Sequence, residues 1–171
     1  MSAKGRGARG EITLERVYRA SLEEIWDLWT TKAGIESWWG PDGFAVTVRK
    51  LDLRPQGELL YAMTAVGPEQ VAFMKRAGMP ITTEARIVYT EVVPRRRLAY
   101  VQVADFVPGL EPYDVATEVE LHPAGKAVRM VLTLERMHDE EWTRRAVAGW
   151  EGQLGKLARL LSARPGAGAD P

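Results

Sequence analysis

The chain has 171 residues, with 23 basic and 23 acidic side chains, no cysteine and two histidines. Its zero formal charge argues against nucleic-acid binding and against anchoring to an anionic membrane, since both normally need a basic excess. The missing cysteines exclude disulfides, thiolate metal sites and cysteine nucleophiles. Two histidines are too few for a three-histidine metal site. We expect no metal ion and no cofactor.

The two ends of the chain differ from the middle. Residues 1–10 are basic but lack the apolar stretch of a signal peptide, so we expect a disordered leader. Residues 163–171 are rich in glycine, alanine and proline and predict a disordered tail. Residues 11–162 are then one domain. No apolar run approaches the length needed to cross a bilayer, and we expect a cytoplasmic protein.

Seven segments alternate apolar and polar residues with the period of a β-strand. They are 11–20, 44–54, 58–65, 83–93, 97–106, 113–122 and 126–137. In the first segment Ile12, Leu14 and Val17 are the expected inward positions. In the last, Val128, Met130, Leu132 and Leu134 face one side, and Arg129, Thr133 and Glu135 face the other. Tight turns separate most of the last six segments, which predicts an antiparallel meander.

Two short helices are expected after the first strand. Ser21 and Glu24 can form a capping box, in which each side chain accepts a hydrogen bond from the other's backbone amide. This predicts a helix over 22–30. Thr31 is placed to start a second helix, which ends at the glycine- and proline-rich turn after Trp39.

A long helix is expected over about 139–162, with Asp139 as its N-terminal cap. Apolar residues recur in it at spacings of three and four, and they form one stripe. The stripe consists of Trp142, Ala146, Trp150, Leu154, Leu157 and Leu161. Gly149, next to Trp150, is expected to permit a close approach of this helix to the sheet.

The segment 67–80 interrupts the meander. Pro68 suits a first helical position and Gly78 suits a stop, so a short helix is expected. Phe73, Met74 and Met79 would give this helix an apolar side. That side would serve either as a lid over a pocket or as a dimer contact.

This order of elements predicts an α+β fold: a strand, two short helices, a six-stranded antiparallel meander and a long C-terminal helix packed across the curved sheet. A strongly curved sheet wrapped around one helix need not fill its concave side. The remaining space would form a pocket.

The chain also resembles a known family. The segments that carry the resemblance are Ala20-Ser-Leu-Glu-Glu-Ile-Trp26, Ile35-Glu-Ser-Trp-Trp39, Asp52-Leu-Arg-Pro-Gln-Gly57, Tyr89-Thr-Glu-Val-Val-Pro-Arg-Arg-Arg-Leu98 and Ala148-Gly-Trp150. Their order is similar to that in the helix-grip superfamily of START domains, birch-pollen-allergen-like proteins and polyketide cyclases (SRPBCC). Within it, they resemble domains related to the C-terminal part of the activator of the ninety-kilodalton heat-shock chaperone's ATPase. Gln56 stands where the family pattern often has a glycine.

The resemblance implies a helix-grip fold and an apolar ligand between the sheet and the last helix. The residues that we place near this cavity are Trp38, Trp39, Tyr61, Met63, Phe73, Met74, Tyr100, Gln102, Met130 and Trp150. Aromatic rings and methionines suit apolar ligands, and a few polar groups would orient them. Packing in the core is the alternative for the tryptophans and methionines, and solvent exposure is the alternative for Gln102.

Three functions follow from these observations. The first is binding of a small apolar or aromatic molecule. The second is an enzyme of the cyclase, aromatase or hydrolase kind, using acids and bases chosen from Glu84, Tyr100, Asp105, Asp114, His122 and His138. None of these lies in a catalytic motif, so no catalytic residue is assigned. The third is a protein-interaction module with a chaperone or stress-response partner. A homodimer suits any of the three.

Overall fold

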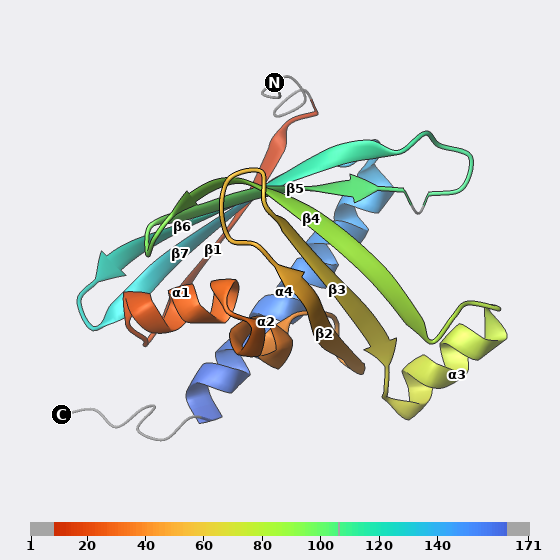
Figure 1. Cartoon of the computed structure of the whole chain (residues 1–171), viewed down its shortest axis with the longest axis horizontal. Helices are drawn as coiled ribbons and strands as arrows, with labels where there is room; N and C mark the ends of the chain where they lie inside the picture. The colour runs from red at the N-terminus through yellow and green to blue at the C-terminus, as the bar shows by residue number, and fades with distance from the viewer. Residues whose placement is uncertain (1–8, 106, 164–171) are drawn as a thin grey trace.

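The computed structural model describes residues 9–105 and 107–163 of the chain (Figure 1). Its elements are β1 (Glu11–Tyr18), α1 (Leu22–Thr30), α2 (Lys32–Trp38), β2 (Phe44–Leu51), β3 (Glu58–Ala65), α3 (Pro68–Arg76), β4 (Thr82–Val93), β5 (Arg97–Ala104), β6 (Tyr113–Ala124), β7 (Ala127–Glu135) and α4 (Glu140–Ala163). This order confirms the predicted fold. The predicted leader and tail lie almost entirely outside the described residues.

The seven strands form one antiparallel sheet in the order β1-β7-β6-β5-β4-β3-β2. Strands β2 to β7 are the meander. The first strand, β1, pairs with the last one, β7, and Leu14 lies opposite Leu132. Figure 1 shows the sheet curving around α4, with α1 and α2 beside it. The apolar faces of all these elements meet in one core.

Local capping residues define where the helices begin. The backbone amide of Glu24 donates to Ser21 Oγ, and that of Ser21 donates to Glu24 Oε1, each over 3.0 Å. The Thr31 hydroxyl accepts from the amide of Gly34 over 3.0 Å at the start of α2. Satisfying these otherwise unpaired amides stabilises the first turn of a helix. The predicted capping box is therefore confirmed.

The turn after α2 is fixed to the C-terminal half of α4. Gln153 Oε1 accepts from the amide of Gly40 over 3.0 Å, and Lys156 Nζ donates to the Gly40 carbonyl over 3.1 Å. Arg159 pairs with Asp42 over 3.1 Å. Burial lowers the pKa of Lys156, with Asp42 opposing this effect and Arg159 adding to it. These contacts position the long helix across the sheet.

Three predicted positions are wrong. Val17 is 62% exposed, whereas Tyr18 is buried, because β1 keeps its alternation to the end and does not shift. Apart from its own helix, no atom of residues 9–105 and 107–163 lies within 4 Å of a Cβ placed on Gly149, so this glycine does not mediate close packing on the sheet. Glu135, which the alternation assigns to the outer face, is buried.

Helix α3 extends beyond the end of β3 and β4 (Figure 1). Pro68 occupies its first turn as expected, and Met74 is buried while Phe73 and Met79 are about half exposed. The lid and dimer-contact alternatives for this helix stay predictions. In the described part of the chain, no helix is long and apolar enough to cross a membrane.

Candidate functional site

A cavity of about 120 Å³ lies between the sheet and the N-terminal half of α4. Strands β5, β6 and β7 form one wall, and Ala146 and Trp150 of α4 form the other. Three polar side chains, those of Gln102, Thr117 and Glu135, interrupt an otherwise apolar lining. A mostly apolar wall with a few polar groups is typical of small-molecule sites.

The apolar stripe of α4 explains where this cavity lies. Leu154, Leu157 and Leu161 are buried against the core, whereas Ala146 and Trp150 are only partly buried. The side chain of Ala146 is small, and Ala104 on the facing strand is small as well. Two alanines on opposite walls do not fill the space between helix and sheet. The space therefore remains at the N-terminal half of the stripe.

Trp150, which lines the cavity, belongs to a cluster of aromatic rings. Trp150 stacks on Trp29 with centroids 5.8 Å apart and planes at 23°. Trp29 in turn meets the edges of Trp38 and Trp39 at 4.9 and 6.0 Å. Its indole nitrogen donates to the sulfur of Met130 over 3.3 Å. These contacts hold the Trp150 ring, the one member of the cluster that lines the cavity, in place.

The structure brings only some of the predicted site residues to this cavity. Gln102 and Trp150 line it. Five others, Trp38, Trp39, Tyr61, Tyr100 and Met130, are buried in the core. Met63 packs against the core from a partly buried position, and Phe73 and Met74 lie on α3. A ligand contact by these eight residues stays a prediction.

Burial determines the protonation of the core tyrosines. It raises the pKa of Tyr61 to about 12. It also raises the pKa of Tyr100 well above its usual range, with Tyr61 and Tyr89 adding to the effect and a hydrogen bond from Thr117 opposing it. A phenol with a raised pKa is neutral at pH 7. The hydroxyl of Tyr100, which is hydrogen-bonded to Thr117, is therefore neutral at pH 7.

Glu135 is the residue that sequence reasoning missed. Its side chain is 2% exposed, although the alternation of β7, in which Leu134 is buried, places Glu135 on the outer face. Oε1 accepts from the backbone amide of Ala116 over 2.9 Å and lies 3.3 Å from Arg9 Nη2. Arg9 is held by the carbonyls of Arg136 and Asp114 and lies over the Tyr113 ring. No sequence pattern signals this burial, because it depends on partners distant in the chain: Ala116 lies 19 positions away and Arg9 126.

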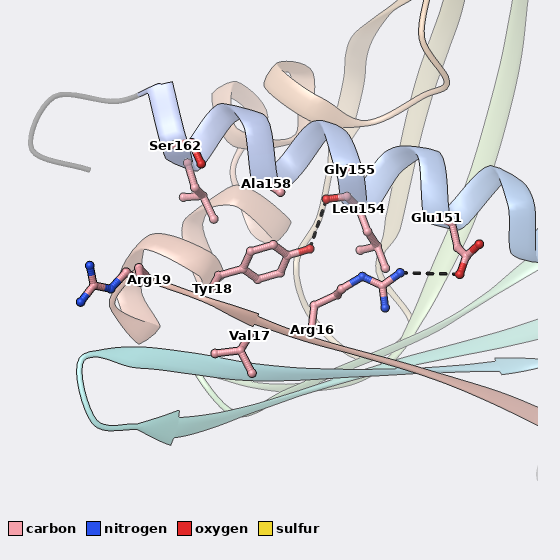
Figure 2. A pocket seen from close by; sticks show the side chains of 10 residues that line it. Arg16, Val17, Tyr18, Arg19, Glu151, Leu154, Gly155, Ala158 and Ser162 are labelled. Atoms are coloured by element: carbon pink, nitrogen blue, oxygen red, sulfur yellow. Dashed lines mark hydrogen bonds and ion pairs between the residues drawn. The ribbon is translucent and has the colours of Figure 1, made fainter. Parts of the chain in front are cut away.

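A second, larger pocket lies on the surface between β1 and the C-terminal half of α4 (Figure 2). It has a volume of about 630 Å³ and includes Arg16, Tyr18, Glu151 and Leu154 in its lining. Three of its polar side chains already have partners within the pocket: Arg16 lies 3.6 Å from Glu151, and the Tyr18 hydroxyl donates to the Leu154 carbonyl over 3.2 Å. The smaller cavity is the better candidate site, because one of its buried polar groups is only partly satisfied.

The candidate acids and bases do not gather around that cavity. Glu84 lies 3.4 Å from Arg49, and His122 lies 3.7 Å from Glu120. His138 Nδ1 is 2.7 Å from the Tyr113 hydroxyl. Within residues 9–105 and 107–163, no three histidine or carboxylate side chains are grouped so that they could hold a metal ion.

Comparison with known proteins agrees with this fold. A protein from Chromobacterium violaceum has a solved structure that matches with a TM-score of 0.72 and 24% identity, covering 90% of this chain and 98% of that chain. The AHSA1 protein from Silicibacter pomeroyi matches at 0.69 and 21%, with coverage of 90% and 98%. An AHSA1-like protein from Aeromonas hydrophila matches at 0.69 and 19%, with coverage of 90% and 92%. At these identities the likeness establishes the fold alone.

No curated protein matches the chain. The profile of one family matches residues 19–162, which include both short helices, the whole meander and nearly all of α4. The match therefore includes the capping box at Ser21, the tryptophan pair and the cavity-lining strands. The chain belongs to the family of Activator of Hsp90 ATPase homolog 1-like proteins, with a helix-grip fold.

Proposed function

We propose that this protein binds a small aromatic or other planar apolar molecule in the cavity between β5, β6, β7 and α4. The observation that carries the proposal is the lining itself, in which the Trp150 ring faces a wall with three polar side chains. A planar ligand would bury its faces against Trp150 and the aliphatic residues of the strands. Gln102 and Thr117 would orient its polar edge.

The volume sets the size of the ligand. Buried apolar cavities of about 150 Å³ accept one benzene ring. A cavity of about 120 Å³ therefore encloses about one ring, and the second ring of a fused pair would extend from its open side. With about nine heavy atoms and about 0.5 kcal/mol per atom, a simple probe would bind with a dissociation constant of about 1 mM. The natural ligand would bind more tightly, because it would also use the polar groups.

Native mass spectrometry of the protein from its own host, followed by organic extraction, tests this proposal. A stoichiometric small molecule is expected in the wild-type protein. The variant Ala146→Phe fills the cavity from the helix side and is expected to lose that molecule. Ala148→Phe is the matched control, because Ala148 is exposed on the same helix and does not line the cavity.

The chemical state of the extracted molecule also separates binding from catalysis. An unchanged molecule supports binding, whereas a mixture of substrate and product would favour the enzyme hypothesis. Two results together would contradict a ligand site at this cavity. They are a wild-type mass without any bound molecule, and equal binding of a simple aromatic probe to Ala146→Phe and Ala148→Phe.

A further inference from the structure

Glu135 has one carboxylate oxygen that the fold does not use. Oε1 contacts Ala116 and Arg9, but Oε2 is buried and has no hydrogen-bond partner among residues 9–105 and 107–163. A buried acceptor without a donor is destabilising, and native structures contain few of them. Because Glu135 lines the candidate cavity, a bound molecule that displaces the side chains covering Oε2 can reach this carboxylate.

The structural role of Glu135 needs only one oxygen. The pairing between β6 and β7 ends at Thr117 and Leu134, so the next amide, that of Ala116, has no partner on β7. Oε1 accepts from that amide. A glutamine would serve the same purpose through its carbonyl oxygen without placing a charge inside the protein. The second oxygen is therefore available for another purpose.

The surroundings of Glu135 make a buried carboxylate tolerable. Arg9 Nη2 lies 3.3 Å from Oε1, and its guanidinium is fixed by the carbonyls of Arg136 and Asp114. A paired and hydrogen-bonded charge can remain buried where an isolated one would not. The carboxylate is held in place at the cavity wall before any ligand binds, which lowers the entropy lost on binding.

We infer that the ligand of this cavity carries an N–H or O–H group that donates to Glu135 Oε2 while its planar apolar part packs beside Trp150. This inference rests on the proposed function and specifies the chemical class of its ligand. An acceptor at the same position of the ligand would face the lone pairs of Oε2 and be repelled. The site would therefore select donors over apolar or acceptor analogues of the same shape.

Indole and indene test this selection, since they have nearly the same shape and only indole has an N–H donor. Both are titrated into uniformly ¹⁵N-labelled full-length protein, and dissociation constants are taken from amide shifts at residues around the cavity. Wild-type protein is expected to bind indole at least about tenfold more tightly than indene, as a hydrogen bond to a charged acceptor implies.

Glu135→Gln should remove this preference. The amide of Ala116 needs an acceptor, so the carbonyl oxygen of the new side chain takes the place of Oε1 and its NH₂ group takes the place of Oε2. The N–H of indole would then face the NH₂ group of the glutamine, which is also a donor. The preference for indole over indene should therefore fall below about twofold. Glu118→Gln is the matched control: Glu118 is also a buried carboxylate, on the neighbouring strand, but it pairs with Arg97 and does not line the cavity.

The outcomes distinguish the donor contact with Glu135 from the proposed binding of a ligand in the cavity. Equal binding of indole and indene to the wild-type protein would overturn the donor inference and leave the cavity as an apolar site. This comparison needs no variant, so it holds even if Glu135→Gln fails to fold. A preference that persists in folded Glu135→Gln would assign the donor contact elsewhere and also overturn the inference. Shifts with neither probe, in the absence of an extracted ligand, would overturn the proposed function as well.

Discussion

Replacing Gly34 by alanine is expected to destabilise the protein, although alanine is the better helix former. Gly34 lies in α2, where this helix turns back against α1. A Cβ at this position would overlap the carbonyl oxygen of Asp27 and lie 2.7 Å from Leu28 Cα and 2.8 Å from Thr31 Oγ1. Two of these atoms belong to the backbone and cannot rotate away. The contact between α1 and α2 must therefore open.

The magnitude follows from two opposing terms. Overpacking of a tight site usually costs about 1–3 kcal/mol, and the backbone contacts at Gly34 favour the upper end. Alanine in place of glycine in a helix contributes about 1 kcal/mol of stability. The net loss for Gly34→Ala is then about 2 kcal/mol. For a chain of this size, such a loss lowers Tm by about 4–8 °C.

Gly152→Ala is the matched control. Gly152 is exposed in α4, and in the described part of the chain nothing outside its own helix lies within 4 Å of a Cβ placed there. Only the helix-forming term remains, so this variant should gain about 1 kcal/mol. Urea unfolding followed by tryptophan fluorescence measures both. The reasoning is refuted if Gly34→Ala is as stable as Gly152→Ala, because the α1–α2 contact would then yield without cost.

Three further perturbations test other contacts. Tyr18→Phe removes the hydrogen bond to the Leu154 carbonyl and should lower the free energy of unfolding by about 1 kcal/mol; an unchanged urea midpoint would mean that this bond contributes nothing. Arg97→Met takes the guanidinium from the buried carboxylate of Glu118 and, because Arg97 is one-third exposed, should lower stability by about 2 kcal/mol at pH 7. The double variant Arg97→Met/Glu118→Gln should lose less than the sum of the single changes. Burial raises the pKa of both Tyr18 and Tyr61 to about 12 from 10.0, so the stability that they provide is complete below pH 10 and is lost as the pH rises through 12. The urea midpoint should therefore be lower at pH 11 than at pH 9, and the difference should be smaller in Tyr18→Phe than in the wild-type protein. Equal midpoints at the two pH values would contradict the assigned burial.

Much of the fold could be predicted because its signals are local. The reciprocal hydrogen bonds of Ser21 and Glu24 join residues three positions apart, and the start of α2 depends on Thr31 and Gly34 in the same way. Strand alternation is equally local, since neighbouring side chains must point to opposite faces of a sheet. These signals identified every helix and strand to within a few residues.

The candidate site could be predicted only in part. Gln102 and Trp150 were among the expected residues, because aromatic and polar side chains on inward positions are visible in the sequence. The sequence does not show which inward positions are filled by their neighbours. Trp39 and Tyr61, for example, pack edge to face with ring centroids 5.4 Å apart, so each occupies space that a ligand beside the other would need. Ala146 becomes important only because another alanine faces it across the cavity.

Glu135 shows where local patterns end and tertiary structure begins. By itself the sequence determined the order of elements, the helix caps and the apolar faces, since each depends on residues a few positions apart. It could not determine the burial of Glu135, which depends on the end of the β6–β7 pairing and on Arg9, 126 positions earlier. The cavity likewise depends on how far α4 stands from a curved sheet. Only the packing of distant segments fixes that separation, so only the tertiary structure decided where a ligand can bind.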